Sequence, residues 1–387
     1  GRAGVNAWRG FILGLIFHAV LLYWLGHVTI AGTALLAVVL AGYMAFLAVV
    51  IGECRRFRAW VPLAALAWAG VEYCRSLGPF SFAWGYLGHG LYPCREMIQL
   101  AYWIGVPGLS FLLMGFNASL ASAGEHLPRP SKTDTRVRPD WIQRSVDGTT
   151  LLVFTGMLLG NWFYGKAVMA RFQQPPADSL AIRVAVIQGN YEQDRKETAS
   201  LDETLADYLN LSRQALAGAP DLIVWPESTI TYPVNFWPEG VEQIQRFADQ
   251  ANVELLAGTV RGNQTARNTL IFLNQAILFT PGKSVKLDGP EVDLHEFPSY
   301  SKMHLVPFGE WVPWGEHWPF SMIETLIEEA GAGIFKPGDH QTLFVTRQGA
   351  RFAVAICFES TLAWMWRQAR NQGADFVITI TNDAWYK

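Results

Sequence analysis

Apolar residues occur in long runs over the first 170 residues of the chain and in much shorter runs after that point. Crossing a lipid bilayer as an α-helix takes about 20 predominantly apolar residues, and the long runs are near that length. We therefore predict an α-helical transmembrane domain at residues 1–172, with about five spanning helices. The runs lie at residues 10–28, 31–52, 59–74, 98–123 and 149–170.

Basic residues gather at alternate ends of these runs. Lys and Arg precede the first run, follow the second and follow the fourth. Cytoplasmic loops carry the excess of positive charge, so these three segments are predicted to be cytoplasmic. The fifth run then leaves the cytoplasm. Residues after about Arg171 are therefore predicted to lie on the far side of the membrane.

The short runs of the second half alternate with stretches of helical spacing. This alternation predicts an α/β layered domain at residues 180–387. The polar stretch at residues 283–301 is predicted to be a loop. Strands are expected at 181–187, 221–225, 253–260, 269–273, 276–279, 342–345, 352–356 and 376–380, and helices at 196–217, 238–252 and 361–372.

Composition supports the division into two parts. The chain is 51% hydrophobic and only 16% charged, which is typical of a protein with a membrane component. Residues 1–172 hold 14 Lys and Arg against 7 Asp and Glu, while the remainder holds 16 against 26. The acidic second half argues against nucleic acid as a partner. The four cysteines show no zinc-site or disulfide spacing, so no metal and no cofactor is predicted.

Cys357 occupies the most informative position in the second half. Five apolar residues, 352–356, lead into it, and a helical pattern begins at Thr361. A strand that turns into a helix there would place the thiol at a sheet edge, near backbone N–H groups able to stabilise an oxyanion. Taken alone, Cys357 is better explained as a buried core cysteine, and the nucleophile interpretation depends on residues elsewhere in the chain.

Two further residues complete a set for acyl transfer. Glu227 follows a buried strand, and Lys302 lies in a stretch that contains Gly and Pro. A carboxylate can accept the proton of a cysteine thiol, and a lysine can stabilise the oxyanion formed when sulfur attacks a carbonyl. The sequence therefore indicates Glu227 as base, Lys302 as electrostatic stabiliser and Cys357 as nucleophile.

Four motifs in order carry a family resemblance: WPES at 225–228, KMHLVPFGEWVP at 302–313, ICFES at 356–360 and TNDAWY at 381–386. This set resembles the carbon–nitrogen hydrolase (nitrilase) superfamily. With the spanning runs in front, the chain looks like its membrane branch, the apolipoprotein N-acyltransferases. The loop GPFSFAWGY at 78–86 is also similar to a family loop between spanning helices.

The resemblance implies roles for individual residues. Glu227, Lys302 and Cys357 would be catalytic, in an αββα sandwich. Glu310 would be the accessory carboxylate, and Glu359 would take the second accessory position. Phe358 stands where many members carry Tyr, which leaves its backbone N–H for oxyanion binding. The resemblance also implies that the first spanning helices and the C-terminal part of the sandwich are missing from this chain.

The implied reaction moves an acyl chain from a phospholipid to the α-amino group of the N-terminal diacylglyceryl-cysteine of apolipoproteins, through a thioester on Cys357. It needs no cofactor. The catalytic domain of such a multi-pass protein would face the periplasm from a bacterial inner membrane. Aromatic residues near the expected catalytic loops suit the headgroup region, or else ordinary core packing: Phe236, Trp237, Trp311, Trp314, Trp318 and Phe320.

Two other functions remain open at this point. A membrane-tethered amidase or nitrilase would keep the same three residues and use water to hydrolyse a C–N bond, without lipid dependence. Several spanning runs count against it, since a tether needs one. A non-catalytic membrane protein that binds lipid or lipoprotein would use the α/β domain as a scaffold, and the intact Glu, Lys and Cys count against that.

Overall fold

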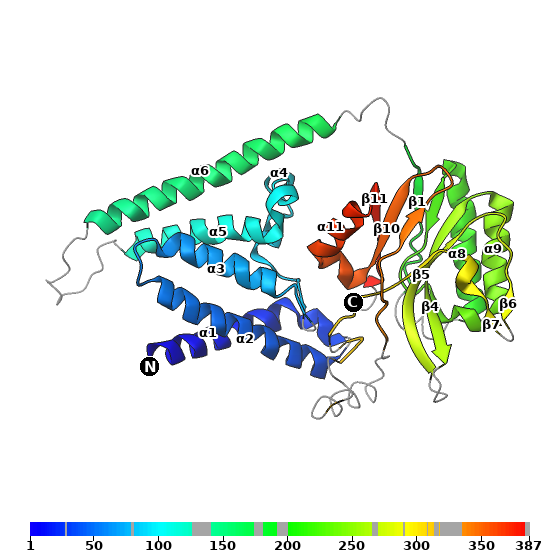
Figure 1. Ribbon diagram of the computed structural model, residues 1–387, viewed down its shortest axis with the longest axis horizontal. Coiled ribbons are helices and arrows are strands. Elements are labelled where there is room, and N and C mark those ends of the chain that lie inside the picture. Colours follow the sequence, from blue (N-terminus) through cyan, green and yellow to red (C-terminus); the bar gives the residue numbers. More distant parts are fainter. Residues whose placement is uncertain are drawn as a thin grey trace. The chain divides into compact units, whose positions relative to one another are not determined.

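The computed structural model describes residues 1–27, 29–78, 81–125, 141–173, 181–191, 200–264, 270–288, 291–307, 309–312, 317 and 335–383. They fall into two compact units. One comprises residues 1–23 and 33–177 and is helical, and the other comprises residues 24–32 and 178–387 and contains the strands (Figure 1).

Three helices of the helical unit, α1, α2 and α5, are long and apolar enough to cross a membrane. The helix α3 has 15 residues and α6 has 32, and neither is among these candidate spans. The number of membrane crossings therefore stays a prediction. The helices are α1 (Arg2–Leu21), α2 (Ile30–Cys54), α3 (Trp60–Cys74), α4 (Arg95–Ile98), α5 (Ala101–Glu125) and α6 (Trp141–Phe172), with 3-10 turns η1 (Tyr23–His27) and η2 (Leu87–Leu91).

Helices α1 and α2 pack closely because α1 carries glycines at the contact. A Cβ on Gly10 would lie 2.6 Å from the carbonyl oxygen of Met44, and one on Gly14 would lie 3.0 Å from the Cα of Ala41. Small residues of this kind allow close helix packing in membranes, where no hydrophobic effect drives helices together. The contact therefore fits a pair of helices surrounded by lipid.

In the described residues, the second unit has a larger and a smaller main sheet, together with a two-stranded sheet of β6 and β7. The larger has the order β1-β2-β4-β5-β8, with β3 beside β4. Its strands β1, β2 and β4 are parallel, whereas β5 is antiparallel to β4 and β8. The smaller sheet has the order β11-β10-β9, with β10 and β11 parallel. Helices α8 and α9 cover the larger sheet, and α11 lies on the smaller sheet (Figure 1).

The elements of this unit follow the sequence pattern closely. The strands are β1 (Val184–Val186), β2 (Leu222–Val224), β3 (Ile230–Pro233), β4 (Glu254–Gln264), β5 (Leu270–Phe279), β6 (Leu287–Asp288), β7 (Glu291–Val292), β8 (Ser299–Ser301), β9 (Leu343–Val345), β10 (Arg351–Ile356) and β11 (Phe376–Ile380). The helices are α8 (Leu201–Ala215), α9 (Pro238–Ala251) and α11 (Ala363–Asn371), with 3-10 turns η3 (Leu216–Gly218), η4 (Val234–Phe236), η5 (Leu294–Glu296) and η6 (Cys357–Thr361).

The main core lies between the larger sheet and its two helices. Strand β2, which includes Ile223, is buried along its whole length. Trp225, the residue after β2, and Leu255 on β4 are buried as well. Parallel strands covered on both faces read as near-continuous apolar runs, which is why β2 was recognisable in the sequence. Ser200 caps α8 by accepting a hydrogen bond from the N–H of Glu203, whose side chain bonds back to Ser200.

Three sequence expectations need correction. The two strands predicted at 269–273 and 276–279 are one strand, β5, whose polar Asn274 and Gln275 stay in the ladder with β4. The stretch 283–301 is not one loop, because it contains β6, β7, η5 and β8. The helix predicted from residue 361 is preceded by the turn η6 and begins at Ala363. The strand β3 was not predicted.

Candidate active site

Each of the three predicted catalytic residues lies within three residues of the end of a strand. Glu227 follows β2 by three residues, Lys302 is the residue after β8, and Cys357 is the residue after β10. Glu227 is 7% exposed and Lys302 is 1% exposed, whereas Cys357 is partly exposed. Charged side chains are almost never buried to this degree unless they are paired. Their partners therefore define the site.

Lys302 lies between two carboxylates. Its Nζ is 3.2 Å from Oε1 of Glu227 and 2.8 Å from Oε1 of Glu310. The second oxygen of Glu310 accepts the backbone N–H of Val306, at 2.9 Å. The structure thus brings together Glu227, Lys302 and Glu310, as expected from the sequence. The group carries two negative charges and one positive charge within a buried space.

Two further donors fix Glu227. Asn274 on β5 donates from Nδ2 to Oε1 of Glu227 at 2.7 Å, and the N–H of Asn382 donates to Oε2 at 3.2 Å. The carbonyl oxygen of Asn274 also accepts the N–H of Lys302, at 2.8 Å. Asn274 therefore positions both the carboxylate and the lysine.

The backbone is strained at two residues of the site. Cys357 has φ of +52° and Ser228, next to Glu227, has φ of +46°. Left-handed conformations are uncommon for residues other than glycine and persist where surrounding structure enforces them. Gly258 on β4 has a related role, because a Cβ there would lie 2.1 Å from the carbonyl oxygen of Pro226. The turn that carries Glu227 packs directly on β4.

Charge and burial set the protonation of the thiol. Burial raises the pKa of Cys357, the charge of Glu227 raises it further, and Lys302 opposes this only in part, so that the pKa lies at about 12. Burial opposes the charge on Lys302, but Glu227 and Glu310 outweigh it and hold the lysine pKa well above its ordinary value. The resting site therefore holds a neutral thiol beside an ammonium group.

Glu359 joins the Cys357 turn to the Lys302 strand. Its Oε1 accepts the hydroxyl of Tyr300 at 2.7 Å and the backbone N–H groups of Met303 and His304, while Oε2 accepts the N–H of Ile356 at 2.8 Å. Glu359 is fully buried, and burial raises its pKa against these four donors. Glu359 thus fixes the spacing between the segments that follow β8 and β10, which carry Lys302 and Cys357.

Phe358, predicted to offer its N–H to an oxyanion, is fully buried as a core side chain. Its proposed N–H contact stays a prediction. Among the expected aromatic residues, Trp237 packs against the main core. Trp314, Trp318 and Phe320 lie outside the described residues. Within the described residues, no three His, Cys, Asp or Glu side chains gather as a metal site would require.

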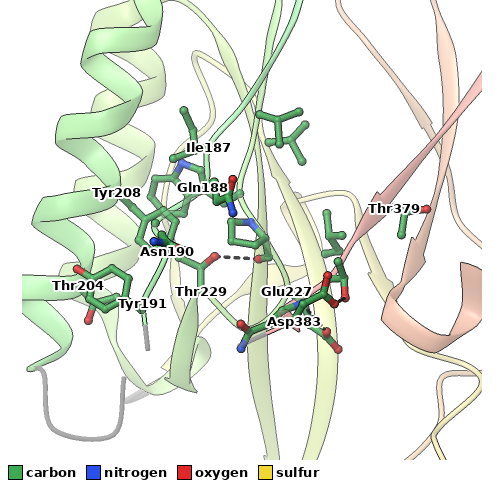
Figure 2. A pocket seen from close by; sticks show the side chains of 18 residues that line it. Ile187, Gln188, Asn190, Tyr191, Thr204, Tyr208, Glu227, Thr229, Thr379 and Asp383 are labelled. Atoms are coloured by element: carbon green, nitrogen blue, oxygen red, sulfur yellow. Dashed lines mark hydrogen bonds between the residues drawn. The ribbon is translucent and has the colours of Figure 1, made fainter. Parts of the chain in front are cut away.

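A cavity of about 420 Å³ adjoins Glu227. Its described lining comes from the residues that follow β1, β2 and β11, together with side chains of α8. Figure 2 shows Glu227 and Asp383 towards one end of this cavity, and Tyr191 and Thr204 towards the other. Thr381, another lining residue, is close enough to Cys357 to lower the pKa of its thiol. The cavity therefore reaches the surroundings of both the base and the nucleophile.

The sequence matches two family descriptions. Residues 183–387 match the carbon–nitrogen hydrolase family, and residues 2–119 match the N-terminal domain of apolipoprotein N-acyltransferase. The chain is 31% identical to an apolipoprotein N-acyltransferase of Geobacter metallireducens, over 97% of this chain and 69% of that protein. The chain belongs to the apolipoprotein N-acyltransferase family.

Other relatives agree with this assignment. An apolipoprotein N-acyltransferase of Pasteurella multocida is 28% identical, over 98% of this chain and 69% of that protein. Among solved structures, an amidase from Nesterenkonia sp. is 17% identical with a TM-score of 0.34, covering 52% of this chain and 64% of that one. Membership of the family confirms the sequence-based assignment to the membrane branch of the carbon–nitrogen hydrolases and its enzyme class, acyltransferase.

Several site residues were not found from the sequence. Asn274 lies inside an apolar stretch, where a single amide looked like a break between two strands. Tyr300, Thr381 and Asp383 lie inside or beside recognised motifs, but nothing in their spacing assigned them a contact. The polar residue within an otherwise buried run was the one signal that pointed to Asn274.

Proposed function

We propose that this member of the family moves an acyl chain from a phospholipid to the α-amino group of an N-terminal diacylglyceryl-cysteine. The observation that carries the proposal is the buried group of Glu227, Lys302 and Glu310 beside a strained Cys357. These are a base, a cation and a nucleophile, the groups that acyl transfer needs. The identities of donor and acceptor rest on the family.

In the first half of the reaction, the Cys357 thiol is neutral at rest and must lose its proton as it attacks. Glu227 takes that proton while sulfur bonds to the ester carbonyl carbon, and the ammonium group of Lys302 stabilises the resulting oxyanion. Collapse breaks the carbon–oxygen bond of the ester. The lysophospholipid oxygen then leaves with the proton from Glu227, and a thioester remains on Cys357.

In the second half, the amine of the acceptor attacks the thioester carbonyl. Glu227, ionised again, takes a proton from the nitrogen as the carbon–nitrogen bond forms. The carbon–sulfur bond breaks, and the Cys357 sulfur regains its proton from Glu227. The product is an amide, and the enzyme returns to its starting state.

Two carboxylates support this cycle without touching the reacting atoms. Glu310 keeps Lys302 charged and oriented through its 2.8 Å contact. Glu359 holds the strands that carry Lys302 and Cys357 at one spacing. Rigid support of this kind matters because misplacing catalytic groups by about 1 Å can cost about 100-fold in rate.

The setting we propose is a bacterial inner membrane, crossed several times, with the catalytic unit on the periplasmic side. The three helices able to span a membrane support the membrane location. The alternating basic ends of the apolar runs support the orientation. Both proposed substrates carry acyl chains, so a catalytic unit beside the bilayer has direct access to them.

The test is an N-acylation assay with the purified protein in mixed micelles of phospholipid and a synthetic diacylglyceryl-cysteine peptide. The parent is expected to form the N-acyl peptide, and Glu227→Gln is expected to be slower by about 10³-fold, since general base catalysis contributes 10²–10⁴-fold. Asp288→Asn, on the exposed strand β6, is the matched control and should keep full activity.

The alternative functions predict different results in that assay. A hydrolase would release fatty acid from phospholipid at the same rate with and without the peptide, or would cleave simple amides without lipid. A binding protein would retain the peptide and phospholipid but form no product in a folded sample. Either result would overturn the proposed reaction.

A further inference from the structure

The cavity beside Glu227 has an uneven distribution of charge. Two carboxylates, those of Glu227 and Asp383, belong to its described lining, and no Lys, Arg or His does. The rest of the described lining is neutral, with hydroxyl groups from threonine and tyrosine and amides from Gln188 and Asn190. At about 420 Å³, the cavity falls within the range of small-molecule sites. It is suited to a polar, positively charged group.

Thr381 lies between Asp383 and the nucleophile, Cys357. The hydroxyl of Thr381 donates to Oδ1 of Asp383 at 2.8 Å, and Thr381 is close enough to Cys357 to lower the pKa of its thiol. The next residue, Asn382, donates its N–H to Glu227. Three consecutive residues after β11 thus connect the cavity to the nucleophile and the base. Asp383 therefore belongs to the same short segment that contacts the base.

Aromatic side chains line the side of the cavity away from Asp383. Tyr191 stacks on Tyr208 with centroids 6.0 Å apart, and Tyr208 packs on Trp225 at 5.4 Å. The indole N–H of Trp225 donates to Ser212, which anchors these rings in the core. The packing of these rings keeps the cavity shape fixed. The cavity therefore has a rigid, uncharged end opposite its two carboxylates.

From this geometry we propose that the cavity is a subsite for a primary ammonium group, held by Asp383 next to Glu227. The proposal rests on the proposed function and names one part of its substrates. An ammonium group has three N–H donors, which match the oxygens of a carboxylate, whereas a phosphate group would meet two like charges. The phosphate of a phospholipid is therefore expected to bind elsewhere.

A primary ammonium group could come from either substrate. One source is the α-amino group of the acceptor, and the other is the headgroup of an ethanolamine phospholipid. In the first case the ammonium group must lose one proton to water before nitrogen attacks the thioester. Glu227 then takes the second proton as the carbon–nitrogen bond forms and passes it to sulfur as the carbon–sulfur bond breaks. In the second case the group only anchors the donor, and no bond to nitrogen forms or breaks.

The experiment separates the two halves of the reaction. Acyl-enzyme is formed from phosphatidylglycerol or phosphatidylethanolamine and measured by intact mass, and the preformed acyl-enzyme is then mixed with increasing diacylglyceryl peptide. For Asp383→Asn, the peptide concentration that gives half-maximal discharge is expected to rise about tenfold, the usual effect of losing one charge-assisted contact. Asp383→Glu should recover most of this loss, and Asp288→Asn should match the parent.

The outcomes are distinct. A defect confined to discharge supports the ammonium subsite and assigns it to the acceptor. A defect confined to acylation by phosphatidylethanolamine, with phosphatidylglycerol unaffected, supports it and assigns it to the donor headgroup. An Asp383→Asn variant equal to the parent in every step, or equally slow in every step with both lipids, overturns the proposal. Failure of the parent to form any acyl-enzyme would instead contradict the proposed function.

Discussion

Glu227 receives hydrogen bonds from three different parts of the chain. The donors are Nδ2 of Asn274 on β5, Nζ of Lys302 after β8 and the N–H of Asn382 after β11. The amide of Asn274 must present nitrogen, because its oxygen would face the carboxylate with like polarity. The base is therefore fixed in position by its surroundings.

Replacing Asn274 tests this arrangement. In Asn274→Asp a second carboxylate would lie where the 2.7 Å donor was, so the two acids would share a proton at neutral pH. We expect kcat/KM to fall about 100-fold at pH 7 and to recover in part as the pH rises and the shared proton is lost. The measurement is a pH profile of kcat/KM.

Asn263→Asp is the control for that profile. Asn263 lies on the neighbouring strand β4, and its replacement is the same change from amide to carboxylate. Its profile should match that of the parent. If Asn274→Asp lost activity equally at all pH values, the amide would be acting on the fold alone, and its assigned effect on the base would be wrong.

At the level of elements, β4 and the turn after β2 are in unusually close contact. A methyl group on Gly258 would lie 2.8 Å from the Cα of Glu227, so the turn must shift to admit it. We expect Gly258→Ala to remain folded and to lose more than about 10-fold in kcat, because the base moves away from the thiol. Gly218→Ala, where a Cβ meets nothing within 4 Å, is the matched control and should be fully active.

Glu359 connects the element that carries Lys302 with the one that carries Cys357. In Glu359→Gln the amide nitrogen would either face the N–H of Ile356 or lose the donors at Oε1. We expect a loss of about 2–3 kcal/mol in the free energy of unfolding, against about 1 kcal/mol for Tyr300→Phe, which removes one donor. Chemical denaturation of the two variants would measure this. Equal small losses would contradict the role of Glu359 as a link between strands.

Features set by a local pattern of residues can be predicted from the sequence, whereas features set by the pairing of distant strands cannot. Buried strands such as β2 and β10 are local patterns, and Glu227 and Cys357 were found because they follow these strands. Lys302 was found instead from the stretch with Gly and Pro around it. The contacts of Asn274 depend on the register of β4 with β5, which pairs Val260 with Asn274 and is set by the whole sheet. The left-handed turn at Cys357 likewise has no local signal, since the residue is not a glycine.

For the molecule as a whole, the buried groups make stability depend on pH. Folding raises the pKa of Cys357 from about 9 to about 12 and raises that of Lys302, so the folded state binds these protons more tightly than the unfolded state. The resulting stability is fully present below about pH 9 and is lost as the pH rises towards 12. The melting temperature should therefore fall with increasing pH across this range.

Thermal unfolding of the parent and of Cys357→Ala between pH 8 and 11 would measure this effect. The variant lacks the thiol, so its melting temperature should fall less steeply, whatever its value at pH 8. Parallel curves for the two proteins would show that the thiol ionises equally in the folded and unfolded states, contrary to its burial beside Glu227.

The first part of the chain is basic and apolar, whereas the second part is acidic, so the two parts differ in composition and charge. The division was readable from composition because membrane helices and a layered α/β unit use different residues. The cavity beside Glu227 could not be predicted from the sequence, because it forms only where the residues that follow β1, β2 and β11 come together.

The measurement that tests the central claim most directly is the intact mass of the purified protein after incubation with phospholipid micelles, followed by addition of a diacylglyceryl-cysteine peptide. We expect a mass increase of one acyl chain in the parent, none in Cys357→Ala, and return to the starting mass only when the peptide is added. Discharge at the same rate in water alone would indicate a hydrolase. A folded parent protein that acquires no acyl chain would contradict Cys357 as the nucleophile.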